Sequence, residues 1–259
     1  MKTTLFFMSG TGNSLSIAKR LAIELGGEIT LTALQSIKEK TVIDAKRVGV
    51  IIPVYFSALP ELAQKAIRLL SFPNSVYNFG ITTCGGADGN TLFHLKTAMN
   101  AQGTQLHAGF TIIMPDNSII LPTSKKTKKA LYDRCGNEIR IIANDIKASV
   151  HNDNKIRLKI RFTIWGYITR IVVLTLFNVT NKWASEACIG CGLCEQICMA
   201  HNIVMENRRP QFLDKCAQCF GCAHWCPTRA LRYGLCRITD KTHYTHPEVS
   251  ALEIIRFNF

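Results

Sequence analysis

The chain has 259 residues, a formal net charge of +13 and a sequence pI near 9.4. This length suits one large domain or two of ordinary size, and an apolar share of 47% allows a buried core. Eleven cysteines would suit a disulfide framework in a small secreted protein, but the opening MKTTLFFM has too short an apolar run for a secretory signal. We therefore expect a cytoplasmic protein whose thiols bind metal.

Apolar runs and helical segments alternate through the first part of the chain. The runs fall at residues 3–8, 28–34, 47–55, 76–84 and 106–114, and the helical segments at 13–27, 59–70 and 89–103. Strands that are apolar throughout are typical of a sheet covered on both faces. The alternation therefore predicts an α/β fold with a doubly wound, parallel, five-stranded sheet.

A loop of small polar residues joins the first predicted strand to the first helix. The sequence MSGTGNS (8–14) lies at a helix N-terminus, where free N–H groups and the helix dipole favour anions. No lysine follows its glycines as a Walker A motif requires, and Leu15 stands where a dinucleotide motif needs a third glycine. We expect the remaining donors to hold a phosphate monoester; they are Ser9, Gly10, Thr11, Gly12, Asn13 and Ser14.

This loop resembles that of the flavodoxins, whose sheet has the strand order 2-1-3-4-5 and binds FMN between strands one and three. The resemblance implies ring contacts from the loops after the third and fourth strands. The candidates are Pro53, Val54, Tyr55, Phe56, Thr83, Cys84, Gly85 and Gly86. Core packing is the alternative for the two aromatic residues, and Cys84 is better read as a small buried side chain than as a redox thiol. Residues 114–117 (MPDN) are a weaker candidate for the far side of the ring.

The middle of the chain carries no motif. Helical spacing of Leu131, Cys135, Ile139, Ile142 and Ile146 predicts a helix over 124–150. Residues 155–183 are basic and apolar, but the run 162–177 contains an arginine and is shorter than the roughly 20 residues that span a bilayer. A helix packed between domains is the favoured interpretation; a basic helix on a membrane surface and a transmembrane span are the less favoured alternatives.

Eight of the cysteines form two copies of the pattern C-x2-C-x2-C-x3-C. They are Cys188, Cys191, Cys194 and Cys198, followed by Cys216, Cys219, Cys222 and Cys226. Zinc is typically held by two C-x2-C pairs, whereas this spacing is the bacterial [4Fe–4S] run, in which the fourth cysteine binds the other cluster. We therefore assign Cys188, Cys191, Cys194 and Cys226 to one cluster. Cys198, Cys216, Cys219 and Cys222 are assigned to the second.

One position departs from the ferredoxin pattern. Pro227 follows Cys226 as expected, but Met199 replaces the proline expected after Cys198. We expect a looser turn and a shifted cluster potential, without the loss of a ligand. Otherwise residues 185–235 resemble bacterial two-cluster ferredoxins, which implies a small α+β domain that carries electrons singly.

The two resemblances together match the flavodoxin–ferredoxin fusion proteins. They imply a flavodoxin-like FMN domain (1–122), a helical linking segment (123–184), a two-cluster ferredoxin domain (185–240) and a C-terminal tail (241–259). The favoured function is intracellular electron transfer between FMN and two [4Fe–4S] clusters. A flavin-dependent reductase of a small quinone-like acceptor and a non-redox sensor module are the alternatives, so enzymatic activity stays open. The basic charge predicts acidic redox proteins or an anionic membrane face as partners. We expect no nucleic-acid partner.

Overall fold

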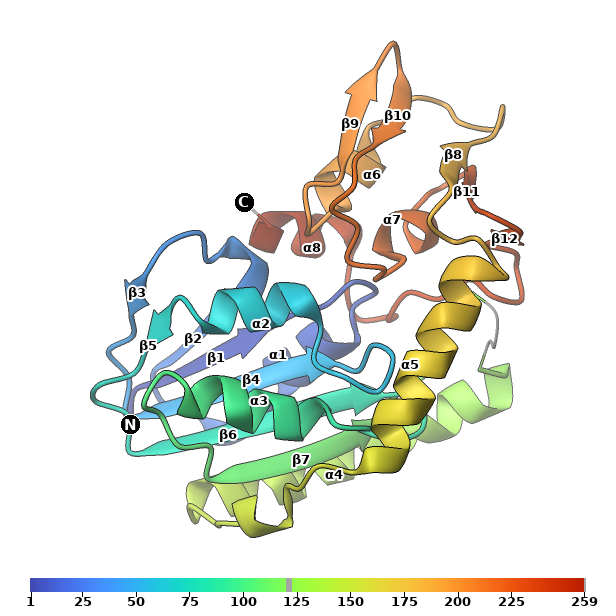
Figure 1. The fold of residues 1–259 in the computed structure, drawn as a ribbon. Coiled ribbons are helices and arrows are strands. Elements are labelled where there is room, and N and C mark those ends of the chain that lie inside the picture. Colours follow the sequence, from blue (N-terminus) through green and yellow to red (C-terminus); the bar gives the residue numbers. More distant parts are fainter. Residues whose placement is uncertain (120–122, 259) are drawn as a thin grey trace.

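A computed structural model describes residues 1–119 and 123–258, and its centre is a sheet of five parallel strands (Figure 1). The strands are β1 (Thr3–Phe7), β2 (Ile29–Ala33), β4 (Arg47–Pro53), β6 (Tyr77–Cys84) and β7 (Ala108–Ile113). Their spatial order is β2-β1-β4-β6-β7, which is 2-1-3-4-5 when only the strands of this sheet are counted. The predicted five-stranded, flavodoxin-like sheet is therefore confirmed. Two short parallel strands outside it, β3 (Thr41–Val42) and β5 (Leu70–Ser71), were not predicted.

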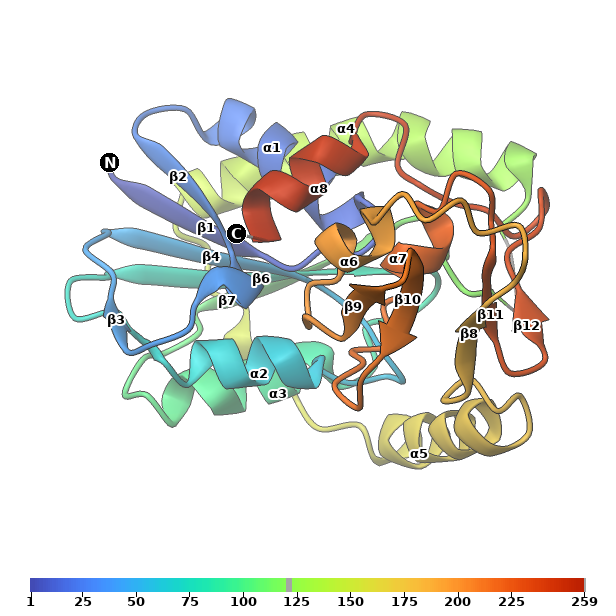
Figure 2. The same cartoon turned by 90° about the horizontal axis from the view of Figure 1, so that it is seen from above.

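Helices cover both faces of the sheet (Figure 2). One face carries α1 (Asn13–Leu25) and α4 (Lys125–Lys147), and the other carries α2 (Glu61–Ile67) and α3 (Thr91–Asn100). Because both faces are covered, every residue of β1 and β6 is buried, and most of their polar residues are threonines.

The predicted helix over 124–150 is α4, and it belongs to the sheet. Cys135, Ile139, Ile142 and Ile146 are buried in the same core as α1, whereas Leu131 is only half-buried. The Ser124 hydroxyl accepts a hydrogen bond from the Thr127 N–H (3.2 Å) and caps the helix. α4 thus completes this helix layer, although the sequence assigned it to the linking segment. The predicted boundary at residue 122 lies outside the described residues.

The helix α5 (Ile160–Thr175) follows a short 3₁₀ turn (Asp153–Lys155) and runs along the outside of the molecule (Figure 2). Gly166 is its only buried residue, so packing of the helix is limited to a narrow stripe. Among the described residues, no helix is both long enough and apolar enough to cross a membrane.

The cysteine-rich part is a small α+β unit made of two structural repeats. It contains two antiparallel sheets, β9–β10 and β8–β11–β12, and two short helices, α6 and α7. Their bounds are β8 (Lys182–Ala184), α6 (Leu193–Ile197), β9 (Ile203–Glu206), β10 (Arg209–Phe212), α7 (Gly221–His224), β11 (Leu231–Tyr233) and β12 (Cys236–Arg237). The helix α7 and the strand β11 begin 28 residues after α6 and β9, which is also the offset between the two cysteine runs.

The C-terminal segment returns to the sheet and ends in α8 (Ala251–Asn258). Phe257 packs edge-on against Phe7 of β1, with 4.9 Å between the ring centres. The buried side chain of Asn258 accepts a hydrogen bond from Gln35 (2.9 Å), in the 3₁₀ turn Leu34–Ser36, and donates one to the carbonyl of Ile197 in α6 (3.0 Å). This segment therefore joins the sheet to the cysteine-rich part. Of the predicted tail, Phe259 lies outside the described residues.

Candidate cofactor sites

A cavity of about 200 Å³ opens where β1, β4, β6 and β7 end. All the predicted flavin-site residues except Gly12 line it. They are Ser9, Gly10, Thr11, Asn13, Ser14, Pro53, Val54, Tyr55, Phe56, Thr83, Cys84, Gly85 and Gly86. Residues distant in the sequence meet here because the carboxyl ends of parallel strands share one edge of the sheet.

The end of the cavity beside α1 presents neutral donors. Ser9 is only 3% exposed, and among the described residues its Oγ has no hydrogen-bond partner. The first backbone N–H groups of α1 also lack partners within the helix. The Thr11 hydroxyl is held by Asn117 Nδ2 (3.3 Å), and the Ser14 hydroxyl by Thr83 (2.9 Å). An unpaired, buried hydroxyl beside a helix N-terminus is a group that an anionic oxygen would satisfy.

Gly12 lies under the C-terminal segment instead of facing the cavity. A Cβ at residue 12 would lie 2.8 Å from the Cβ of His246, whose N–H donates to the carbonyl of Thr11 (2.8 Å). The hydroxyl of Tyr244 donates to Asn13 Oδ1, so the same segment also fixes the start of α1.

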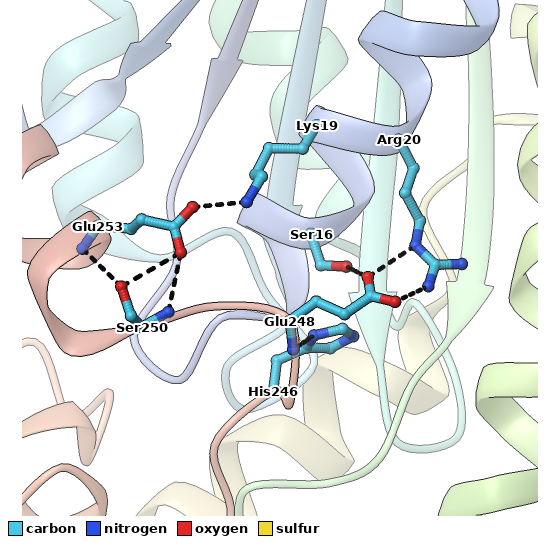
Figure 3. Close-up of polar contacts among 7 residues, drawn as sticks. All are labelled: Ser16, Lys19, Arg20, His246, Glu248, Ser250 and Glu253. Atoms are coloured by element: carbon cyan, nitrogen blue, oxygen red, sulfur yellow. Dashed lines mark hydrogen bonds and ion pairs between the residues drawn. The ribbon is translucent and has the colours of Figure 1, made fainter.

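Ion pairs hold this C-terminal segment on α1 (Figure 3). Glu248 accepts hydrogen bonds from Arg20 and from the Ser16 hydroxyl, and the arginine keeps the pKa of this carboxyl below its usual value. Lys19 pairs with Glu253 and lowers the pKa of that carboxyl in the same way. No local sequence pattern indicates these contacts, because they join residues more than 200 positions apart.

The end of the cavity beside β4 is a tight turn at residues 55–58. Tyr55 and Ala58 form a β-bridge, while Phe56 and Ser57 have φ angles of 49° and 59°. Such left-handed backbone is strained for non-glycine residues and persists only when the surroundings hold it. Here the turn lies against Gly166 of α5, where a Cβ would come within 2.2 Å of the carbonyl oxygen of Phe56.

Two acidic groups in this cavity are shifted toward their neutral forms by burial. Burial raises the pKa of the Cys84 thiol to about 12, which favours its interpretation as a small buried side chain. Burial also raises the pKa of Asp116, which lies against Gly85. Pro115, Asp116 and Asn117 line the cavity. Ser57 and Ala87 also line it, although the sequence analysis did not predict them. The first three belong to the weakly favoured stretch MPDN.

The eight cysteines of the two runs surround two further cavities. One is lined by Cys188, Cys191, Cys194 and Cys226. The other is lined by Cys198, Cys216, Cys219 and Cys222. In each cavity three cysteines come from one run and the fourth from the other run, as in the predicted crossed assignment. Within residues 1–119 and 123–258, no group of three or more His, Cys, Asp or Glu side chains is placed to hold a single metal ion.

Backbone N–H groups point at the sulfur atoms of several of these cysteines. Asn202 N–H donates to Cys198 Sγ (3.2 Å), and Ala230 N–H donates to Cys226 Sγ (3.3 Å). Such bonds stabilise negative charge on sulfur and tune a metal centre. Met199, which replaces the expected proline, is 1% exposed and packs in the core that α2 and α3 share with the sheet. Its side chain therefore anchors this cysteine loop to the sheet.

The second cysteine cavity lies directly beside the cavity at the sheet edge. A Cβ at residue 10 would lie 3.0 Å from the Cβ of Cys219, so only glycine allows this approach. Trp225 Nε1 donates to the carbonyl of Gly10 (2.9 Å), and Asn117 Nδ2 donates to the carbonyl of Cys219 (3.3 Å). The first loop of the sheet and the second cysteine run thus form a common wall.

A larger cavity of about 760 Å³ adjoins both sites. It shares Tyr55, Phe56 and Ser57 with the cavity at the sheet edge and extends to Cys216 of the second cysteine set. One wall is formed by α5, through Phe162, Thr163, Gly166, Tyr167 and Arg170, and another by the start of α2.

Comparisons with known proteins do not assign the chain to a family. No protein-family model and no curated protein matches it. Among solved structures, a Fusobacterium nucleatum flavodoxin mutant bound to flavin mononucleotide is 14% identical, with 57% of this chain and 95% of that chain covered and a TM-score of 0.39. A Streptococcus pneumoniae flavodoxin is also 14% identical (55% and 99% covered, TM-score 0.35). Rubredoxin oxygen:oxidoreductase from Desulfovibrio gigas is 17% identical (57% covered, TM-score 0.37), and this chain spans only 37% of its length. The assignment of a flavodoxin-like fold to the sheet-bearing part is therefore based on the order of its parallel strands.

Proposed function

We propose that the protein transfers electrons between FMN, bound at the edge of the sheet, and two [4Fe–4S] clusters held by the cysteine runs. The observation that carries this proposal is the junction of Gly10 with Cys219, which brings the phosphate loop against one set of cysteines. Electron transfer between two redox groups requires such short separations. FMN would exchange electrons in pairs or singly, and each cluster would exchange them singly.

Three features of the cavity at the sheet edge support FMN. Ser9 Oγ, buried and without a described partner, and the N-terminus of α1 would bind the phosphate. Among the described residues, no lysine or arginine lines this cavity, so the phosphate would be held by neutral donors, as in the loop of flavodoxins. Tyr55 and Phe56 at the other end offer aromatic surface for the ring.

The donor chemistry of the other two cavities supports iron–sulfur clusters. Each is lined by four cysteines in the spacing of the bacterial [4Fe–4S] run, and most of the other side chains that line them are apolar. Backbone N–H groups already aim at the sulfur atoms, which is the usual environment of thiolates bound to iron.

The proposal is tested by flash reduction of anaerobic protein that carries all its cofactors. We expect electrons to redistribute between FMN and the clusters at a rate that does not depend on protein concentration, because the transfer is within one molecule. C219A should abolish this phase and retain FMN. C236A is the matched control, because Cys236 lies in the same part of the chain but outside both cysteine sets. Redistribution that always scales with protein concentration would contradict the proposal.

The 760 Å³ cavity favours a second candidate function, the reduction of a small acceptor such as a quinone. Its volume is typical of ligand sites, and it reaches Tyr55 and Phe56, where the flavin ring is proposed to lie. In this case turnover with quinones should be saturable, and R170A in the wall of the cavity should raise KM more than it lowers kcat. Turnover that rises linearly with quinone, unaffected by R170A, would indicate only non-specific reduction.

A further inference from the structure

The segment around α5 combines positive charge with a complete lack of acidic residues. Residues 154–185 contain no aspartate or glutamate. Six cations lie within this range: Lys155, Arg157, Lys159, Arg161, Arg170 and Lys182. Four of them precede or begin α5 at alternate positions, so positive charge is concentrated at the start of the helix, although Lys159 is paired with Asp88 (3.2 Å).

Large apolar side chains beside these cations face solvent. The exposed ones on α5 or beside it are Leu158, Ile160, Ile164, Trp165, Tyr167, Ile168, Ile171 and Leu176, of which Tyr167 also lines the 760 Å³ cavity. Trp165 is 60% exposed and Tyr167 is 67% exposed, although burial of either ring would stabilise the protein by removing apolar surface from water. Single exposed apolar residues are ordinary, but a continuous group on one helix indicates an interaction surface.

The helix is held firmly in this exposed position. Gly166 packs against the carbonyl of Phe56 on the inner side. The buried amide of Asn90 donates to Thr163 Oγ1 (3.0 Å) and accepts from the N–H of Lys159 (2.9 Å). At the other end, Val173 and Leu174 pack on the core of the cysteine-rich part. The apolar surface is therefore presented outward by a fixed scaffold.

We propose that α5 docks the protein on an anionic lipid surface, lying in the plane of the interface. Tryptophan, tyrosine and aliphatic side chains flanked by lysine and arginine are the composition that such helices use. At 1.5 Å per residue, its 16 residues extend about 24 Å, short of a hydrocarbon core about 30 Å thick, so the helix lies on the bilayer without crossing it.

Charge favours lipid over a second copy of the chain. A symmetric dimer through α5 would bring Arg157, Arg161 and Arg170 of both copies together, and this segment has no acidic residue to neutralise them. An anionic lipid surface offers the complementary charge over a wide area, and apolar depth for the aromatic rings. This inference does not depend on the proposed electron transfer, since it requires no cofactor to be bound.

The test is flotation of the full-length, cofactor-loaded protein with vesicles. Vesicles of phosphatidylcholine alone are compared with vesicles that also contain phosphatidylglycerol. We expect binding to the anionic vesicles, weakened by salt. The double variant R157E/R161E should lower partitioning by about tenfold or more, because each cation near an anionic surface contributes about fivefold. W165Q/I168Q should also lower it strongly.

The matched control is I23Q/L252Q, which changes two other exposed apolar residues on helices away from α5. It should bind vesicles like the unmodified protein, and the cofactor absorbance of every variant reports that it is folded. Equal binding to neutral and anionic vesicles, or unchanged binding of W165Q/I168Q, would overturn the proposal. An absence of vesicle binding would also overturn the proposal. This includes the cases in which α5 mediates self-association or binds an acidic protein.

Discussion

The hydroxyl of Ser9 is buried between the end of β1 and the start of α1, and the described residues offer it no hydrogen-bond partner. A buried polar group without a partner destabilises the folded state by about 1–3 kcal/mol, and a ligand atom in the adjoining cavity would remove this cost. In the proposed function, that atom belongs to the phosphate of FMN. This role distinguishes Ser9 from Ser14, whose hydroxyl is already paired with Thr83.

Replacement of Ser9 by alanine should weaken FMN binding by about 10- to 100-fold, since hydrogen bonds to charged groups contribute about 1.5–3 kcal/mol. The flavin-free protein should be no less stable, because the variant removes an unsatisfied group. Fluorescence titration with FMN and urea unfolding measure the two effects. S36A is the control, because the Ser36 hydroxyl donates to Ala33 (2.8 Å) outside the cavity. Unchanged FMN affinity in S9A would show that Ser9 does not bind the phosphate.

His246 makes stability depend on pH. It is 2% exposed, and burial lowers its pKa to about 4, although Glu248 opposes this shift and Arg20 and Lys19 add to it. The ring of Tyr132 packs edge-on against it. In the unfolded chain its pKa is near 6.5, so the unfolded state binds the proton more readily between about pH 6.5 and 4. The stabilisation is therefore complete above pH 6.5 and is lost as pH falls.

The loss of stability is expected to reach the order of 3 kcal/mol once pH falls below about 4, from about 1.4 kcal/mol per pKa unit. Urea unfolding at a series of pH values between 7 and 5 should show a smaller loss of stability for H246Q than for the unmodified protein. His224, whose pKa is also lowered to about 4 by burial, should preserve part of the slope. Identical slopes for the two proteins would count against this account of His246.

At the scale of elements, the turn at residues 55–58 and the helix α5 depend on each other. Gly166 allows the helix backbone to touch the carbonyl of Phe56, and the turn forms the wall between the 200 Å³ and 760 Å³ cavities. Any displacement of α5 therefore reaches the proposed ring-binding end of the flavin cavity.

G166A should destabilise the protein by about 1–3 kcal/mol and weaken FMN binding, because its Cβ overlaps the Phe56 carbonyl and α5 or the turn must move. G136A in α4 is the control. A Cβ there meets nothing closer than 3.9 Å, so alanine should stabilise the helix by up to about 1 kcal/mol. Thermal unfolding and FMN titration compare the two variants; equal stability of G166A and G136A would refute the proposed contact.

Most of the strands and loops around the 200 Å³ cavity could be predicted from the sequence, whereas few of the contacts between distant segments could. The apolar strands and the small-residue loop are local signals, because burial on both faces and anion binding at a helix start constrain neighbouring residues. The packing of His246 against Gly12 could not be predicted, because no local sequence pattern specifies which distant segment packs there. Ser57 was not predicted as a cavity residue for the same reason. Its left-handed backbone conformation is held by packing against α5 and the loop before α3.

At the scale of the whole molecule, the interleaved cysteine sets tie the two repeats together. Cys226 shares a cavity with Cys188, and Cys198 shares one with Cys216, so neither repeat holds a complete ligand set alone. The crossed grouping of the eight cysteines in the two cavities agrees with the assignment made from the ligand spacing of bacterial [4Fe–4S] runs. The attachment of this unit to the sheet through Met199, Trp225 and Asn258 could not be predicted, because it depends on tertiary packing.

Double variants test the interleaving directly. C188A/C226A removes two ligands from one set, so one cluster should remain. C216A/C226A removes one ligand from each set, so both clusters should be lost or damaged. Iron analysis and the electron paramagnetic resonance of the reduced proteins measure the difference. If C216A/C226A keeps one intact cluster while C188A/C226A keeps none, the ligands are not shared between the runs.

The most direct measurement for the central claim is a cofactor analysis of the full-length protein purified without oxygen. Iron, acid-labile sulfide and released flavin are quantified on one sample together with its absorption spectrum. The account predicts two [4Fe–4S] clusters and one FMN per chain. Protein that contains zinc in place of iron, or that binds neither iron–sulfur clusters nor flavin, would contradict it.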